Sequence, residues 1–346
     1  MATEPATEFT FEGPVAFEEE AKRERVAGLG PWALALRRLR RNKTALAFGA
    51  LFLVIAGLCL AAPYWANHVA HSDPYKNHLT DTVTVGGKKK DVVKPNGVPI
   101  GPTWRGRFLL GADSNGRDIA VRLLYGGRTS LLIGVGAALS TALLSVVFGV
   151  VAGYFRGFTD ALVSRSLDLI WSFPVILLGV ALGTALALGG LKIGPIEIQG
   201  DSKLIPILII AVVYVPYMAR PIRGQVLALR EKEFVEAARA QGAGPLRIMF
   251  TEILPNLSST IVVFLPLMIA NAILLEAALS FLGAGVRPPN PSWGTMIGDG
   301  VEKIVTGPHL AVVPGLMLVL TVLALNVFGD GVRDALDPRA KLHLEH

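Results

Sequence analysis

The sequence predicts an all-α integral membrane protein with six transmembrane helices, cytoplasmic N- and C-termini, and a small external loop that contains a β-hairpin. Composition is the first reason: 52% of the 346 residues are apolar and 17% are charged, and the mean hydropathy is +0.51. Two soluble domains would need more charge, and a disordered chain would be far less apolar. The second reason is a series of long segments that are almost free of charge, and the third is the distribution of basic residues around them.

Six segments are long enough, or nearly so, to cross a bilayer, because a helix needs about 20 residues to span roughly 30 Å of hydrocarbon. The fourth is short, at 16 uncharged residues, and we expect Pro216 and Pro221 to break it. A broken crossing would be either a moving element or simply a short one. The six segments are Thr44–Trp65, Thr129–Phe155, about Ala161 to Leu188, Leu204–Ala219, Leu257–Leu282 and Leu310–Gly329.

Basic residues predict the orientation. Residues 1–30 are acidic and show no cleavable signal, whereas Arg37, Arg38, Arg40, Arg41 and Lys43 directly precede the first crossing. The positive-inside rule places this cluster in the cytoplasm. The helix predicted over 31–43 would lie on the inner membrane surface, or the cluster is an ordinary basic flank. The expected divisions are 1–43 (cytoplasmic, with a basic amphipathic helix), 44–65 (first transmembrane helix), 66–128 (external loop), 129–329 (transmembrane core that includes the cytoplasmic loop 224–258) and 330–346 (cytoplasmic tail).

The external loop contains a predicted β-hairpin. Thr and Val alternate over 81–85, Gly86-Gly87 follows, and then come three lysines and Asp91-Val92-Val93, which is a typical hairpin pattern. Lys88–Lys90 would form either a solvated tip or a contact for an acidic partner or anionic solute.

The cytoplasmic loop between the fourth and fifth crossings, residues 224–258, is the most informative segment. Residues 231–241 are strong helix formers, and Phe234, Ala237, Ala238 and Gln241 share one helical face at i, i+3, i+4, i+7. Gly242 is expected to end this helix in the left-handed conformation. Pro245 is expected to begin a second one. The loop would therefore be a rigid lever, or an amphipathic surface segment without a partner.

This loop resembles the EAA loop of ABC importer permeases, in which Glu-Ala-Ala is followed by Gly and then by Leu-Pro. The matching residues here are Glu236, Ala237, Ala238, Gly242, Leu254 and Pro255. Glu252 stands where that pattern prefers Ile, so this position is not carried over.

Further matches narrow the resemblance to the C-type transmembrane subunit of the dipeptide/oligopeptide/nickel permeases. It covers about 105–340 and Asp73-Pro74-Tyr75, and it fails over 1–30 and about 77–103. The matching motifs are LGADSNGRD (110–118), DLIWSFP (168–174), EAALSFLG (276–283), PPNPSWG (288–294) and GDGVRDALDPR (329–339).

The resemblance implies a multi-pass subunit of the inner or plasma membrane that lies in the lipid bilayer and is not itself an enzyme. Its partners would be a second, related permease, two cytoplasmic ABC ATPase subunits that bind ATP and Mg, and an external solute-binding protein that delivers di- or oligopeptides. Within the sequence there is no G-x-x-x-x-G-K-[ST] phosphate loop. We expect no catalytic residue, metal site or cofactor in this chain. The net charge of +6 is attributed to membrane topology rather than to nucleic-acid binding.

Polar residues inside the predicted crossings are candidates for the translocation pathway. They are Asn271, Glu276, Ser280 and Ser172. Glu276 would either face the pathway or be capped by a neighbouring helix near the outer interface.

Two other function classes were weighed. A secondary transporter would show inverted repeats and paired broken helices with ion-binding acids, yet Glu276 has no obvious acidic partner in the membrane. A membrane scaffold or intramembrane enzyme is the second alternative, but none of the six histidines lies in the middle of a predicted crossing.

Overall fold

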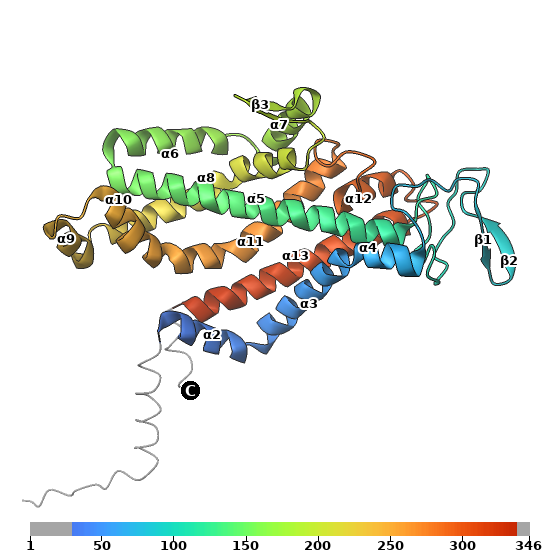
Figure 1. The fold of residues 1–346 in the computed structure, drawn as a ribbon, viewed down its shortest axis with the longest axis horizontal. Coiled ribbons are helices and arrows are strands. Elements are labelled where there is room, and N and C mark those ends of the chain that lie inside the picture. The colour runs from blue at the N-terminus through green and yellow to red at the C-terminus, as the bar shows by residue number, and fades with distance from the viewer. Residues whose placement is uncertain (1–29, 338–346) are drawn as a thin grey trace, which may run out of the picture.

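The computed structural model describes residues 30–337, so residues 1–29 and 338–346 of the expected N-terminal segment and tail lie outside the described part. Long helices run roughly side by side along one axis of an elongated bundle (Figure 1). The helices of the first half are α2 (Pro31–Arg41), α3 (Lys43–Leu60), α4 (Ala62–Trp65), the π-helical turn η1 (Ala66–Ala70), α5 (Ile119–Phe155), α6 (Gly157–Trp171) and α7 (Val175–Gly189). Those of the second half are α8 (Leu204–Leu229), α9 (Glu233–Ala240), α10 (Pro245–Arg247), the π-helical turn η2 (Ile248–Ile253), α11 (Leu254–Phe281), α12 (Trp293–Val301) and α13 (His309–Leu336).

The predicted all-α membrane fold is confirmed. Within the described residues, five helical segments are long and apolar enough to cross a membrane, and α6 with α7 makes a sixth if the pair is one crossing. The fifth crossing is longer than expected, because α10, η2 and α11 form a continuous helical path over Pro245–Phe281.

The sequence predicts the third crossing as one uninterrupted segment, but the structure shows two helices. It is broken after Trp171, and α6 and α7 meet at an angle of 89°. Pro174 lies at this break; it lacks an N–H and pushes the residue before it out of the helical conformation. The two sides of the break differ in polarity: α6 carries Asp160, Arg165 and Asp168, whereas α7 is uncharged.

The prediction of a broken fourth crossing is wrong. α8 is one helix of 26 residues that continues through Pro216 and Pro221. Close packing on α5 holds it, because a side chain at Gly153 would place its Cβ 2.7 Å from Val226 Cβ. The hydroxyl of Ser145 on α5 also donates a hydrogen bond to the carbonyl of Val215, the residue before Pro216, at 3.1 Å.

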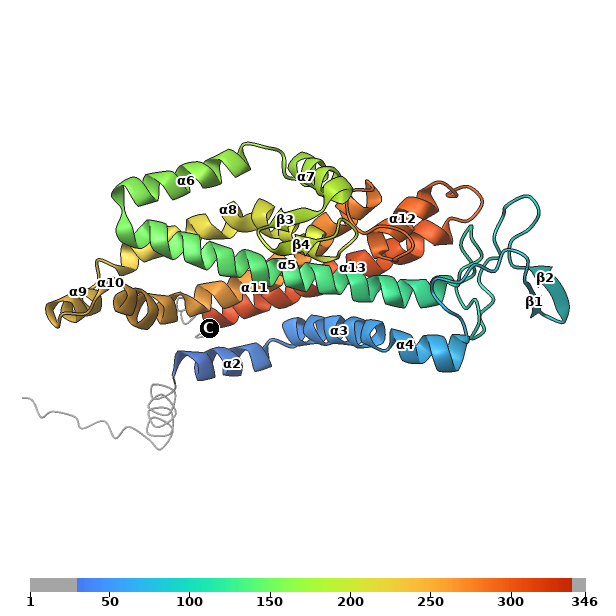
Figure 2. The same ribbon diagram turned by 45° about the horizontal axis from the view of Figure 1, so that its top comes forward.

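The two described ends of the chain lie together at one end of the bundle, beside which α9 and α10 project (Figures 1 and 2). Arg38 Nη1 of α2 donates to the carbonyl of Asp337, at 2.9 Å. The predicted amphipathic helix is confirmed as a helix, with Trp32 and Leu36 exposed one turn apart. Its contact with the membrane surface stays a prediction.

The opposite end of the bundle carries the predicted hairpin (Figure 1). Strands β1 (Thr82–Val85) and β2 (Lys88–Asp91) pair antiparallel, with Val85 opposite Lys88. Gly86 and Gly87 have φ of +60° and +79°, the combination that a two-residue turn between twisted strands requires. A second hairpin, β3 (Leu191–Ile193) with β4 (Ile196–Ile198), follows α7 and was not predicted.

Candidate functional site

The loop between α8 and α11, which the sequence places in the cytoplasm, folds as two short helices joined by a left-handed glycine, as the sequence predicts. α9 ends at Ala240, and Gly242, two residues on, has φ of +81°. The amide of Gly242 donates to Arg239 O at 2.9 Å, and the amide of Ala243 donates to Ala238 O at 3.0 Å. These two bonds form a Schellman cap, which satisfies carbonyls that the end of a helix leaves unpaired. α10 then begins with Pro245 at its first position.

We call residues 231–255 the elbow. One side chain of α9 anchors the elbow to the bundle. Val235 is fully buried, whereas its neighbours Phe234 and Glu236 are exposed. Burial of a valine side chain is worth about 1.5–3 kcal/mol, so it fixes one side of a helix that is otherwise largely solvated. The buried cluster around Val235 includes Met218, Ile222, Val226, Ile248, Met249, Ile253 and Leu257 from α8, η2 and α11.

The predicted common face of α9 is mostly open to solvent. Phe234 is 38% exposed, and Ala237 and Gln241 are exposed on the same side, whereas Ala238 is partly buried against the core. Beyond the glycine break, Leu246 and Phe250 are four residues apart and also exposed, at 67% and 65%. We refer to Phe234, Leu246 and Phe250 as the elbow patch.

The other residues of the EAA motif complete the elbow. Among the described residues, no hydrogen bond or ion pair involves the Glu236 carboxylate, although Lys232 and Arg239 stand at favourable spacings on the helix. Leu254, half-buried, and Pro255, exposed, begin α11 where it leaves the elbow. Glu236 is thus an exposed charge beside an exposed apolar patch.

Four residues were predicted as pathway candidates, and the structure separates them. Glu276 is completely buried; Ser280 donates to its Oε1 at 2.7 Å, and its Oε2 has no hydrogen-bond partner. Ser280 in turn accepts from the amide of Val286. Ser280 lies on α11 itself, one turn from Glu276, so both expected roles of Glu276, facing the pathway or being capped by a neighbouring helix, stay predictions. Asn271 is half-buried, and Ser172 is exposed at the break between α6 and α7.

A polar network at the hairpin end of the bundle was not assigned a role by sequence reasoning, although Asp113, Arg117 and Asp118 lie in the LGADSNGRD motif. Asp118 caps α5 by accepting from the amides of Ala120 and Val121, at 2.9 and 3.2 Å, and its second oxygen accepts from Phe108 N at 2.6 Å. Burial raises the pKa of Asp118, and the three backbone hydrogen bonds oppose this shift.

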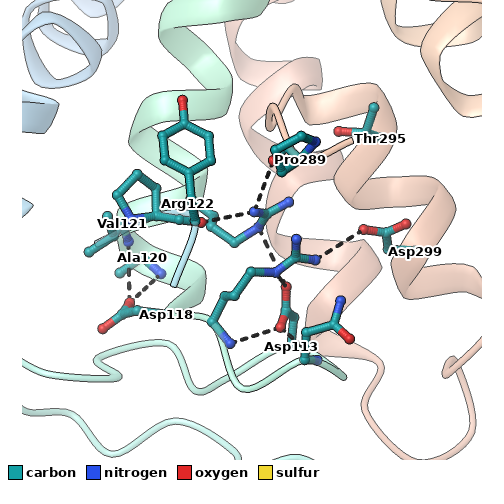
Figure 3. A network of polar contacts seen from close by, with 12 residues as sticks. Asp113, Asp118, Ala120, Val121, Arg122, Pro289, Thr295 and Asp299 are labelled. Atoms are coloured by element: carbon teal, nitrogen blue, oxygen red, sulfur yellow. Dashed lines mark hydrogen bonds and ion pairs between the residues drawn. The ribbon is translucent and has the colours of Figure 1, made fainter. Parts of the chain in front are cut away.

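Two arginines of the same network connect the outer loops (Figure 3). Arg117 Nε donates to Asp113 at 2.7 Å, and a terminal nitrogen lies 3.8 Å from Asp299 of α12. Arg122 Nη1 donates to the carbonyl of Pro74 at 3.0 Å and to that of Pro289 at 3.5 Å. The network ties together the segment after α4, the start of α5 and the segment around α12. In residues 30–337, no group of three or more His, Cys, Asp or Glu side chains is arranged to hold a metal ion.

Comparison with known proteins places this architecture. Residues 145–342 match the family described as binding-protein-dependent transport system inner membrane component. The chain belongs to this family. Residues 30–81 match the N-terminal transmembrane domain of oligopeptide transport permease C, which agrees with the C-type resemblance of the sequence motifs. The chain is accordingly a multi-pass permease of the cell membrane, from the ABC importer permeases of the peptide type.

Relatives of this permease align over most of its length. It is 35% identical over 311 residues to the glutathione transport system permease protein GsiD of Pectobacterium atrosepticum, covering 90% of this chain and 92% of the relative. It is 35% identical over 321 residues to the dipeptide transport system permease protein DppC of Alkalihalophilus pseudofirmus, covering 92% and 93%. Among solved structures, an inward-facing MetNI methionine ABC transporter aligns with a TM-score of 0.49 at 20% identity, covering 62% of this chain and 95% of that chain.

Proposed function

We propose that this permease forms half of the translocation pathway of an ATP-driven importer and that its elbow docks on a cytoplasmic ATPase subunit. The carrying observation is the elbow patch, three exposed apolar side chains on α9, α10 and η2 of an elbow that Val235 anchors to the bundle. An exposed apolar patch beside an unpaired charge is typical of a protein–protein contact. Two ATPase subunits would supply ATP and Mg, and this chain would perform no hydrolysis.

Movement of the elbow would be transmitted to the membrane because α10, η2 and α11 form one helical path. Closure of two ATPases around ATP would push the elbow and switch the helices between inward-open and outward-open packing. ATP can drive this switch only by favouring one of the two states. A second, related permease would complete the pathway, and an external binding protein would deliver the solute at the end that carries the hairpin.

Peptides or peptide-like thiols are the solutes that we propose, since the relatives carry the names dipeptide and glutathione transport permease. Both solute types carry carboxylate and ammonium groups on a chain of amide bonds. Mass spectrometry of the solute that co-purifies with the intact complex would test this; a complex that holds only a metal ion would refute the peptide assignment.

Docking of the elbow is tested by co-purification. Phe234→Ser should reduce the ATPase recovered with the tagged permease, because it removes an apolar contact of the elbow patch. Val305→Ser is the matched control, since Val305 is 93% exposed after α12, near the opposite end of the bundle. Recovery of ATPase at the unaltered level from Phe234→Ser membranes would contradict the docking proposal.

The proposed orientation is tested separately. A cytoplasm-only reporter fused near Gly200, between β4 and α8, should be silent if both termini are cytoplasmic. A strong signal would invert the topology and place the elbow outside the cell.

A further inference from the structure

Charged and aromatic side chains of α6, α8 and α11 form a cluster that is partly exposed at the surface of the bundle. Arg220 Nη2 donates to Asp168 Oδ1 at 2.8 Å, and these side chains are 40% and 50% exposed. The guanidinium of Arg220 lies 5.0 Å from the ring centroid of Trp171. The Trp171 ring stacks on Tyr217 at 6.3 Å, and Tyr217 meets Phe264 edge-on at 6.4 Å. We call these five residues the Arg220 cluster.

The Arg220 cluster lies on α6, α8 and α11 at the elbow-side end of the predicted fourth crossing (204–219), since Arg220 directly follows Ala219. Arg220 is nine residues from the end of α8 at Leu229, which is about 14 Å along a helix. Phe264 is ten residues from the start of α11 at Leu254, which is about 15 Å. Both distances are measured from the helix ends that lead to the elbow, so the cluster belongs to the half of the bundle nearer α9.

Contact with lipid does not fit this surface. Charged side chains on apolar membrane helices are costly to insert into lipid, and such residues face a bundle interior or a water-filled cavity. The polar strip also continues toward the elbow end. Thr260 of α11 donates to Gln225 of α8 at 2.8 Å, and Arg223 of α8 donates to Asp160 of α6 at 2.5 and 2.6 Å.

We propose that the Arg220 cluster lines the solute path in the cytoplasmic half of the permease and there holds the carboxylate of a passing peptide-like solute. This rests on the proposed importer function and names a contact site within it. Arg220 has five N–H donors in a planar fork, and one nitrogen is engaged by Asp168, so donors remain for a second carboxylate. Asp168 offers an acceptor for the ammonium group of the same solute.

The aromatic side chains suit the remainder of such a solute. Trp171, Tyr217 and Phe264 present ring surfaces against which an apolar side chain or a peptide plane can pack without a specific shape. Because Asp168 competes with the solute for Arg220, the contact would be weak enough to release it. A permease that passes many peptides needs both properties, broad acceptance and easy release.

Thiol labelling tests whether the cluster faces water. Cys59, the only cysteine of the sequence, is fully buried, so the unaltered chain is the blank. In the assembled transporter in nanodiscs, a membrane-impermeant methanethiosulfonate should modify Tyr217→Cys at least about tenfold faster than the control, because the reactive thiolate does not form in lipid. Leu53→Cys is the control: Leu53 is 68% exposed among apolar residues of α3, ten residues from its start at Lys43.

Equal labelling rates for the two variants would overturn the proposal, since the cluster would then lie against lipid or be covered by the second permease. This result does not depend on which solute is transported. It therefore decides the placement of the cluster even if the peptide assignment proves wrong.

A charge swap tests the carboxylate contact. Asp168→Arg with Arg220→Asp keeps an ion pair between α6 and α8 but moves the guanidinium off α8. ATP-driven uptake of a labelled dipeptide should fall at least about tenfold, since a charge-assisted hydrogen bond worth 1.5–3 kcal/mol is lost, while ATPases still co-purify. Uptake at the unaltered rate would show that the pair only joins two helices. Absence of dipeptide uptake by the unaltered complex would instead refute the proposed solute.

Discussion

Replacing Gly242 with valine would test whether the shape of the elbow carries the coupling. Gly242 has φ of +81°, and a Cβ built there meets no atom within 4 Å. The perturbation is therefore conformational and creates no steric clash with neighbouring atoms. A left-handed conformation costs an L-residue about 1–2 kcal/mol, and more when the side chain is β-branched. That penalty alone shifts a local equilibrium by a factor of about 5–30.

The expected result is an uncoupled transporter. Gly242→Val should loosen the cap that Arg239 O and Ala238 O form, and so misalign α9, while the buried cluster around Val235 keeps the bundle folded. Solute uptake in proteoliposomes should fall by a similar factor, with the thermal unfolding midpoint unchanged. Gly242→Asn is the matched control, because asparagine tolerates the left-handed region. Normal uptake by the valine variant, or equal loss in the asparagine variant, would refute the reasoning.

Three further changes probe the fold. Gly153→Leu should lower the unfolding midpoint through about 1–3 kcal/mol of overpacking between α5 and α8; Gly57→Leu, with nothing within 4 Å of its Cβ, should not. Asp118→Ala should remove the α5 cap at a cost of about 1–2 kcal/mol and speed proteolysis of the preceding loop, whereas Asp118→Asn should keep the cap, lose the hydrogen bond from Phe108 N and so protect the loop only in part. Hydrogen bonds to His78 and then Arg107 hold the pKa of Asp81 below its usual 3.8. Its stabilising contribution is thus present above pH 3.8 and lost as pH falls through the lowered pKa, and in Asp81→Asn the exchange protection of the outer loop should lose this pH dependence.

Local chemistry made several elements predictable. Gly242 and Pro245 fix a helix end and a helix start by their own backbone preferences, and Gly86-Gly87 between alternating Thr, Val and Lys residues specifies a two-residue turn. Neither case depends on distant contacts, so the sequence pattern was sufficient. The positions of the crossings were predictable for a similar reason, because each crossing is a long apolar segment with few charges.

Features that depend on distant partners were missed. The continuity of α8 is set by packing against glycines of α5, which outweighs the local tendency of Pro216 to break a helix. Asp168 and Arg220 stand 52 residues apart, and no rule of spacing joins two helices across such a separation. Glu276 was considered in both roles, and its hydrogen bond from Ser280 of the same helix does not decide between them.

The length of α5 has a mechanical consequence. Its 37 residues extend about 55 Å, whereas the hydrocarbon layer is about 30 Å thick. At the start of α5, Asp118 accepts a hydrogen bond from Phe108 N in the preceding loop. Just after its end, Arg156 forms an ion pair with Glu231, which precedes α9. A rod fastened in this way tilts as one body. If a binding protein and an ATPase subunit dock as proposed above, movement at either end of the bundle would be transmitted along α5 to the other end.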